Sequence, residues 1–338
     1  MPATTFGDIS PRTAAYAYTK MLRHVEPVLV LAKFGQVKSI PKNKSQTVKF
    51  RRAIPYDAVA APLQEGVTPS AKGTRFEDVT VNLLQWGDVR DLTDVIEDTH
   101  EDPVLDVMMQ LTGEQAGATS EQVIYGVLRG GTSVFFANGA NRSAVNTALS
   151  LNRQRAVVRT LMRNKARKFT SILGPSVNIS TVPIEAAYVA IGHTDLAPDI
   201  RSMAGFVPVA RYGQMKPLCP EEIGAVEDVR YILTPDLAPF INAGGTPGSS
   251  VLSTGGSAAD VYPLLFLGQE AFGITPLKNQ RMGEGNNLAI QPIVLNPGTP
   301  SKSDPLAQRG YVGWKAWFNA VRLNETWMVR LEVAASAL

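Results

Sequence analysis

The alternation of apolar and polar residues is clearest on either side of a long excursion near the amino terminus. Thr47–Arg52 alternate with period two, and so do Phe76–Trp86. Period two is typical of half-buried strands, so we predict that these runs are the two arms of a hairpin. Residues 53–75 between them are rich in Ala, Pro and Gly, with few large apolar side chains. Because this excursion is too long for a tight turn and too poor in apolar mass to form its own core, we expect it, if ordered, to lie on another copy of the chain.

Helical periodicity predicts one long helix in the middle of the chain. Asp102 and Pro103 supply a capping carboxylate and a proline at the first helical position, and the pattern continues to Gly130. The residues that recur at helical spacing are Val104, Met108, Leu111, Gln115, Thr119, Val123 and Val127. Such a helix would span roughly 40 Å and serve as a spine. Gly113 and Gly117 within it indicate either close packing or a bend.

The remaining elements are shorter. We predict a helix at Pro11–Phe34, a basic helix at Asn152–Lys168, and from Ser180 onward short strands and helices. These are strands at Ala186–Ile191, Val226–Leu233 and Pro263–Leu267, and a helix at Ala197–Met203. The end of the chain predicts a hairpin with arms Tyr311–Arg322 and Trp327–Val333, because apolar and polar residues alternate in its second arm.

Composition indicates a folded protein of ordinary polarity. The chain has 338 residues, of which 44% are hydrophobic and 19% charged, enough for a large core and two lobes. One cysteine, Cys219, excludes an intrachain disulfide framework and a cysteine-based zinc site. Residues 1–10 lack the features of a secretory signal, and the longest apolar run, Val28–Ala32, is far shorter than the ~20 residues of a membrane span. We therefore expect synthesis and folding in a cytoplasm.

Charge is distributed in blocks, although the net charge is only +3. Lys38–Arg52 holds six bases and no acid, Asp91–Asp106 holds seven acids and no base, and Arg153–Lys168 holds seven bases and no acid. Each block is explained equally well as a solvated face or as one of several complementary surfaces between copies.

The residues typical of an active site do not form a recognisable motif. His24, His100 and His193 are scattered, and the second histidine that His100-Glu101 would need for a metalloprotease motif falls at Val104. The glycine-rich stretches lack the Lys-Ser/Thr of a phosphate loop and the third glycine of a dinucleotide fingerprint, and there is no Gly-x-Ser-x-Gly elbow. We predict no catalytic residue, no metal site and no cofactor.

Short motifs in a fixed order carry a resemblance to a known family. They are Ile40–Asn43 with Thr47–Arg52, Pro62–Pro69, Gln85–Gly87, Phe206–Val209, Tyr212–Gly213, Glu222–Gly224, Asp260–Pro263 with Leu267–Gly273, Val312–Lys315, and Leu323–Glu325 with Trp327–Met328. Over roughly residues 20–336, the order of elements and these motifs resemble the major capsid protein of tailed phages, the Hong Kong 97-type fold. The residues of these motifs are most similar to those of the N-four-like podophage branch.

The resemblance implies an α+β chain with an N-terminal arm, an extended β-hairpin loop, a long spine helix, a peripheral lobe and an axial α/β lobe. The implied division is 1–44 for the arm, 45–87 for the extended loop hairpin, 88–174 for the peripheral domain with the spine helix, 175–240 for the axial domain, and 241–338 for the return to the peripheral domain with the terminal β-hairpin. The implied function is that of a major capsid subunit, not an enzyme, which self-assembles into hexamers and pentamers of an icosahedral shell enclosing double-stranded DNA.

Candidate interface residues follow from this resemblance. In the extended loop they are Arg51, Arg52, Pro55, Leu63, Gln64, Glu65, Gly66, Val67 and Lys72. Lys72 is the one lysine at the place where some relatives form a covalent cross-link between subunits. Arg155, Arg159, Arg163 and Arg167 would face DNA phosphates or pair with Asp91, Asp94 and Asp98 of a neighbouring subunit. We favour subunit pairing, because a shell that matures cannot hold DNA too tightly.

The implied partners are other copies of the chain, a separate scaffolding protein, a portal, a decoration protein and packaged DNA contacted without sequence specificity, but no membrane. The chain would reside in the virion capsid after assembly in the host cytoplasm. Two alternatives stay open: a shell subunit of an encapsulin-like compartment that encloses a cargo protein, and a soluble α+β enzyme.

Overall fold

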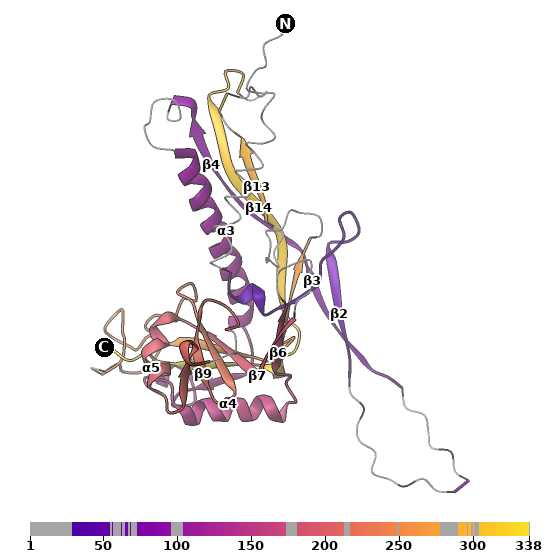
Figure 1. Ribbon diagram of the computed structural model, residues 1–338, viewed down its shortest axis with the longest axis vertical. Coiled ribbons are helices and arrows are strands. Elements are labelled where there is room, and N and C mark those ends of the chain that lie inside the picture. The colour runs from indigo at the N-terminus through magenta and orange to yellow at the C-terminus, as the bar shows by residue number, and fades with distance from the viewer. Residues whose placement is uncertain are drawn as a thin grey trace.

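The molecule combines a long upright arm, a compact lobe at its foot and a hairpin that projects to one side (Figure 1). The computed structural model describes residues 29–54, 56, 62, 65–66, 68, 73–95, 104–173, 181–212, 217–248, 250–277, 290–295, 297–298, 300 and 304–337. The predicted helix at Pro11–Phe34 lies largely outside these ranges, and its described end forms a 3₁₀ turn, η2 (Leu31–Lys33).

The upright arm is built on a five-stranded sheet. Its members are β1 (Gln36–Val37), β12 (Phe272–Pro276), β14 (Arg309–Arg322), β13 (Ile290–Leu295) and β4 (Leu84–Thr93). β14 is the central strand, because β12 and β13 follow one another along one of its edges while β4 lies along the other. All three pair with β14 in antiparallel fashion.

The spine helix α3 (Val104–Arg129) runs beside this sheet, so the predicted long helix is confirmed (Figure 1). The residues that recur at helical spacing from Val104 to Val127 are not its most buried ones: they are exposed or half-buried, although Met108, Val123 and Val127 pack against the core. The buried face is instead offset around the helix and consists of Met109, Thr112, Gly113, Ala116, Gly117, Ser120, Glu121, Ile124, Tyr125 and Leu128. Both glycines are buried in an unbroken helix, which favours close packing over a bend, because small residues allow a helix to approach its neighbours.

The compact lobe holds an eight-stranded sheet in the order β5-β15-β11-β7-β10-β9-β8, with β6 paired to β7. The strands are β5 (Val134–Phe136), β15 (Met328–Val333), β11 (Tyr262–Leu267), β7 (Thr181–Gly192), β10 (Val229–Leu233), β9 (Glu222–Val226), β8 (Phe206–Pro208) and β6 (Phe169–Leu173). Helices α4 (Leu151–Arg163) and α5 (Ala197–Ser202) belong to the same lobe (Figure 1). The described residues also form the 3₁₀ turns η3 (Arg142–Ala144), η4 (Thr194–Leu196), η5 (Val209–Arg211) and η6 (Glu325–Trp327).

The predicted terminal hairpin is wrong as a pairing, although both of its strands exist. β14 belongs to the five-stranded sheet, whereas β15 lies between β11 and β5 in the eight-stranded sheet. The half-buried strand that the alternation predicts for the second arm is also wrong, since every residue of β15 is buried. The reason is that one hydrophobic cluster covers one face of this sheet and a second cluster covers the other, so its central strands need apolar or paired side chains on both faces.

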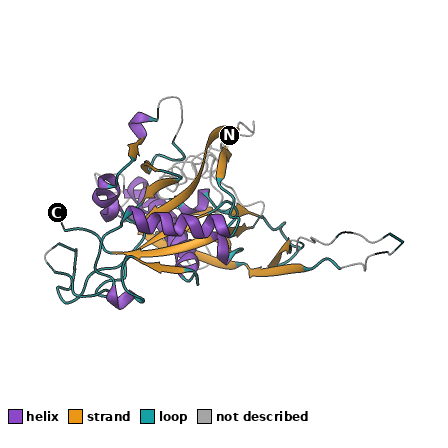
Figure 2. Ribbon diagram, turned by 90° about the horizontal axis from the view of Figure 1, so that it is seen from below, coloured by secondary structure: helices purple, strands orange, loops and turns teal. Residues whose placement is uncertain are grey.

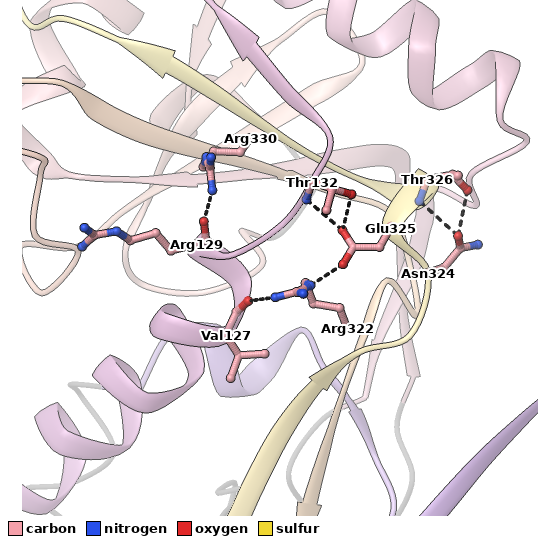
Figure 3. A network of polar contacts seen from close by, with 8 residues as sticks. All are labelled: Val127, Arg129, Thr132, Arg322, Asn324, Glu325, Thr326 and Arg330. Atoms are coloured by element: carbon pink, nitrogen blue, oxygen red, sulfur yellow. Dashed lines mark hydrogen bonds and ion pairs between the residues drawn. The ribbon is translucent and has the colours of Figure 1, made fainter. Parts of the chain in front are cut away.

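The crossing between the two sheets is held by a polar network at the end of the spine helix (Figure 3). The Arg322 guanidinium donates to the carbonyl of Val127 at 2.6 Å and pairs with Glu325. Glu325 also accepts hydrogen bonds from the backbone and hydroxyl of Thr132 at 3.1 and 3.3 Å. Arg330 donates to the carbonyl of Arg129. These contacts satisfy carbonyl groups that a helix leaves unpaired at its carboxyl end, and so join the last turn of α3 to both sheets.

The other predicted elements need small corrections. The run Val226–Leu233 is not a single strand: Val226 ends β9, Glu227 (φ 52°) lies in the turn, and Val229–Leu233 is β10, the second arm of the hairpin. The basic helix ends at Arg163 rather than Lys168, because Lys165 adopts a left-handed backbone (φ 53°) that stops helical propagation. The strands near 186–191 and 263–267 and the helix near 197–203 are confirmed. The division into domains stays a prediction.

Candidate subunit interface

The projecting hairpin confirms the prediction for the two alternating runs. β2 (Thr47–Ala53) and β3 (Phe76–Asn82) pair antiparallel, with Thr47 opposite Asn82 and Ala53 opposite Phe76. The pair forms a two-stranded sheet of its own. It extends well beyond the body of the molecule in both views (Figures 1 and 2).

The root of the hairpin is fixed to the five-stranded sheet. Phe50 is buried against Gly273, where an added Cβ would come within 3.0 Å of the Phe50 ring. The Lys38 ammonium lies 5.5 Å from the centre of the same ring, and the Asn319 amide donates to the carbonyl of Asn82 at 2.8 Å. An aromatic anchor and a sheet contact therefore set the direction in which the hairpin leaves the body.

The charged residues of the shaft are paired with each other across the two strands. Arg51 makes two parallel bonds to Asp78, at 2.8 and 2.9 Å, and Arg52 pairs with Glu77 at 2.5 Å. The bonds from Arg51 hold the pKa of Asp78 below its usual value. Opposite charges at directly opposed positions favour this register, so both predicted interface arginines are already engaged within the hairpin.

Beyond these pairs the hairpin exposes apolar side chains. Ile54 is 43% exposed, Tyr56 70% and Phe76 58%. Sequence reasoning did not name these three as site residues, although Ile54 and Tyr56 continue the alternation of Val48 and Phe50 past the first predicted arm, and Phe76 begins the second. Exposed aromatic and branched residues gathered on a narrow projection mark an interaction surface.

The predicted loop residues are only partly within the described ranges. Glu65 and Gly66 are exposed, and Gly66 has φ 78°, a turn conformation. Pro55, Leu63, Gln64, Val67 and Lys72 lie outside the described residues.

The basic helix α4 is positioned by its apolar side. The Ser150 side chain caps it by accepting from the backbone of Arg153, and Val157 and Leu161 are buried. Gln154 is also buried, where it donates to the carbonyl of Val226 and accepts from the Tyr231 hydroxyl, each at 2.8 Å. The other side of the helix, which carries the arginines, is therefore turned outward.

The four candidate arginines divide into two pairs. Arg155 binds Glu227 of its own chain, which raises the pKa of Arg155, and Arg167 lies 3.8 Å from Glu270, beyond the end of the helix. Arg159 and Arg163 are exposed, and within the described part of the chain neither has an ion-pair partner. These two are the arginines that remain available to another molecule.

The two candidate acids that the structure describes, Asp91 and Asp94, lie far from α4. Asp91 is exposed near the end of β4, Asp94 follows this strand, and Asp98 lies outside the described residues. β4 runs along the upright arm, whereas α4 lies at the foot of the compact lobe (Figure 1). The arginines therefore do not meet Asp91 or Asp94 within one copy of the chain.

A buried glutamate joins the amino-terminal segment to the spine helix. Glu121 Oε1 accepts hydrogen bonds from the backbones of Leu31 and Val30, at 2.7 and 3.3 Å. Its Oε2 is buried without a hydrogen-bond partner among the described residues. Burial raises the pKa of Glu121 to about 8. Sequence reasoning missed this residue, but its spacing from Gly117 and Ile124 places it on their face and could have indicated burial.

The described residues contain little that suggests catalysis. They hold no group of three or more His, Cys, Asp or Glu residues placed to bind a metal ion. Burial raises the pKa of the Cys219 thiol to about 12, which disfavours the reactive thiolate. His193 accepts from the backbone of Asp195 at its own turn. Across these residues no helix is both long and apolar enough to cross a bilayer.

Comparison with known proteins identifies the fold. No protein-family model and no curated protein match the sequence. The structure resembles the capsid of Ralstonia phage GP4, with a TM-score of 0.63 and 12% identity over 91% of this chain and 90% of that one. It also resembles the capsid of cyanophage Pam1, with a TM-score of 0.60 and 13% identity over 93% of both chains. For the capsid of cyanophage P-SCSP1u the TM-score is 0.58 at 10% identity, over 91% and 89%. The chain therefore has the α+β fold of tailed-phage capsid proteins, the Hong Kong 97-type fold.

Proposed function

We propose that this chain is the major capsid subunit of a tailed phage and builds an icosahedral shell of hexamers and pentamers around double-stranded DNA. The observation that carries the proposal is the hairpin. Its strands are held at their root by Phe50, while Ile54, Tyr56 and Phe76 stand exposed beyond any core of their own chain. Such a projection gains stability only when it lies on a neighbouring subunit, and the fold is that of the phage capsids named above, over most of both chains.

Electron microscopy of the purified chain tests this proposal. We expect closed shells of uniform diameter when the chain is produced together with its scaffolding protein, and rings or irregular assemblies when it is produced alone. A chain that stays monomeric at high concentration in both preparations contradicts the proposal and favours the soluble enzyme. Shells filled with a cargo protein instead of DNA favour the encapsulin-like compartment.

The finer parts of the proposal rest on the sequence motifs and on the partners that the resemblance to phage capsid proteins implies. We place the chain in the N-four-like podophage branch because the motifs from Ile40–Asn43 to Trp327–Met328 match that branch in order. We propose a separate scaffold, a portal and a decoration protein as its partners, and assembly in the host cytoplasm before the chain becomes part of the virion. A mass-spectrometric inventory of purified particles tests these partners directly.

We propose that Arg159 and Arg163 contact a neighbouring subunit rather than packaged DNA. The support is that Arg155 of α4, and Arg167 just beyond the end of this helix, already pair with carboxylates of their own chain. Replacing Arg159 and Arg163 with Glu should then reduce the number of assembled particles. If empty shells form normally and only packaging fails, the arginines serve DNA instead, and the subunit-pairing proposal is wrong. The matched control is Arg201→Glu, which reverses an exposed charge on α5.

A further inference from the structure

The outer edge of β4 is a long strand edge without a partner among the described residues. β4 has ten residues, and it pairs with β14 along one edge only. Most of its side chains are exposed, including Leu84 at 46% and Val89 at 59%. An edge of this length is a template for another strand, and proteins that do not use such an edge usually shorten or cover it.

The pairing with β14 shows which backbone groups face the open edge. The backbone of Asp94 donates to the carbonyl of Gln308 at 3.0 Å, so the even-numbered residues of β4 bond to β14. Two prolines agree with this assignment. Pro292 of β13 and Pro276 of β12 each lie opposite an even-numbered residue of β14. Since the even-numbered residues of β14 bond to β4 on the other side, no N–H is needed at these positions, and a proline is tolerated there.

The odd-numbered residues of β4 therefore present their backbone groups outward. They are Gln85, Gly87, Val89, Asp91 and Thr93. In the single chain the N–H of Val89 is held by the Asp88 side chain at 2.9 Å, a local bond that a strand partner would replace.

We infer that this edge pairs with the same edge of a second copy, antiparallel and two-fold symmetric, with Val89 opposite Val89 of the second copy. This inference rests on the proposed function, since it names one contact between subunits of the shell. Asp88 pairs with Arg90 of its own strand at 3.0 Å, and in this register it also lies opposite Arg90 of the second copy, while Trp86 lies opposite Leu92. Moving the two-fold axis by one residue would place Asp88 opposite Asp88, or Arg90 opposite Arg90, so charge favours the Val89 register.

The flank of the spine helix extends this surface. Gln115 donates to Asp88 Oδ2 at 2.6 Å, which places this side of α3 above the edge of β4. Leu111 lies one turn before Gln115 and Val107 one turn before that, and they are 57% and 49% exposed. In the two-fold pair both spine helices lie on the same face of one continuous sheet, with these apolar flanks turned toward each other.

The arrangement leaves the hairpins free. β3 leads into β4 (Figure 1). Two antiparallel copies of β4 therefore send their hairpins in opposite directions from the shared edge. Each hairpin can then lie on a further subunit. One edge contact and one hairpin contact per chain are enough to extend a shell in two directions.

Disulfide trapping in assembled particles tests the register. Val89→Cys should give a disulfide-linked dimer on a non-reducing gel after mild oxidation, at least tenfold above the unmodified chain, because directly opposed residues have Cα atoms about 5.5 Å apart. The native Cys219 is buried and gives little background. The matched control is Ile293→Cys: Ile293 is 43% exposed and lies in the same row of the sheet, with Gly313 between it and Val89, but does not face its own copy.

A second set of variants covers the case in which Val89→Cys does not assemble. The double variant Gln85→Cys/Thr93→Cys should also give dimers, since these positions face each other across the axis but lie too far apart within one strand. Arg90→Asp should lower dimer trapping in the cysteine background, and Asp88→Arg/Arg90→Asp should restore it. Intact particles without dimers in either cysteine variant overturn the inference, while the shell function stands. Dimers from a chain that never forms shells support the inference and contradict the shell function.

Discussion

Replacing Glu121 with glutamine should remove a pH dependence of stability that this one carboxyl creates. Glu121 is fully buried beneath the amino-terminal segment, where it accepts from Leu31 and Val30, while its second oxygen has no partner among the described residues. Burial is the main cause that raises its pKa from 4.5 to about 8; the charge of Asp236 adds to this effect, and that of Lys33 opposes it. The folded protein therefore keeps a proton that the unfolded chain releases.

The sign and size of the effect follow from this difference. Between pH 4.5 and 8 the folded state binds more protons than the unfolded state, so the free energy of unfolding falls as the pH rises and levels off above the folded pKa. One pKa unit corresponds to about 1.4 kcal/mol, which gives an upper bound of about 5 kcal/mol for the whole interval. Water entry and small movements of the amino-terminal segment over Glu121 reduce this free-energy difference, and we expect about 2–3 kcal/mol.

Glu121→Gln keeps the carbonyl that accepts from Leu31 and Val30 but cannot ionise. Its amide nitrogen replaces an unpaired oxygen, so at pH 5 we expect a loss of about 1 kcal/mol, and at pH 8 stability equal to or above that of the unmodified chain. The assay is urea denaturation of the unassembled chain from pH 5 to 8.5, with hydrogen exchange of residues 29–34 as a local readout. The control is Glu65→Gln, which removes an exposed carboxyl. Parallel pH profiles for Glu121→Gln and the unmodified chain would refute the reasoning.

Three further outcomes are expected. Arg142→Ala should lower the free energy of unfolding by about 2–4 kcal/mol in urea denaturation, because Arg142 makes two bonds, at 2.7 and 2.8 Å, to the fully buried carboxylate of Glu332; a loss below 0.5 kcal/mol would contradict this. Gly313→Val should reduce the yield of folded protein and its melting temperature, because a Cβ there would lie 2.7 Å from a backbone oxygen of β4. An unchanged melting temperature would show that β4 and β14 can move apart at no cost. Tyr56→Asp with Phe76→Asp should reduce shell yield at least tenfold, as counted by electron microscopy, while circular dichroism of the monomer stays unchanged; normal shells would exclude the hairpin as an interface.

The local elements were predicted wherever one periodicity dominated. The alternation in Thr47–Arg52 and Phe76–Trp86 predicted a hairpin, and β2 and β3 pair as expected, because a strand with one open face shows its period directly. The spine helix was predicted from its cap and its helical periodicity, but the residues that showed the periodicity are not its most buried ones. Glycine, alanine and serine pack well against a sheet although they contribute little to a hydrophobic pattern, so the true face was hidden.

The sequence by itself determined the hairpin and the spine helix. Only the tertiary structure decided which strands meet: β14 and β15 are neighbours along the chain but belong to different sheets, and the joint between them depends on Arg322, Glu325 and Arg330 (Figure 3). The open edge of β4 and the burial of Glu121 were likewise decided there. The physical reason is that periodicity shows which side chains of a segment are buried and which are exposed. The identity of the segment that packs against it depends on residues far away in the chain.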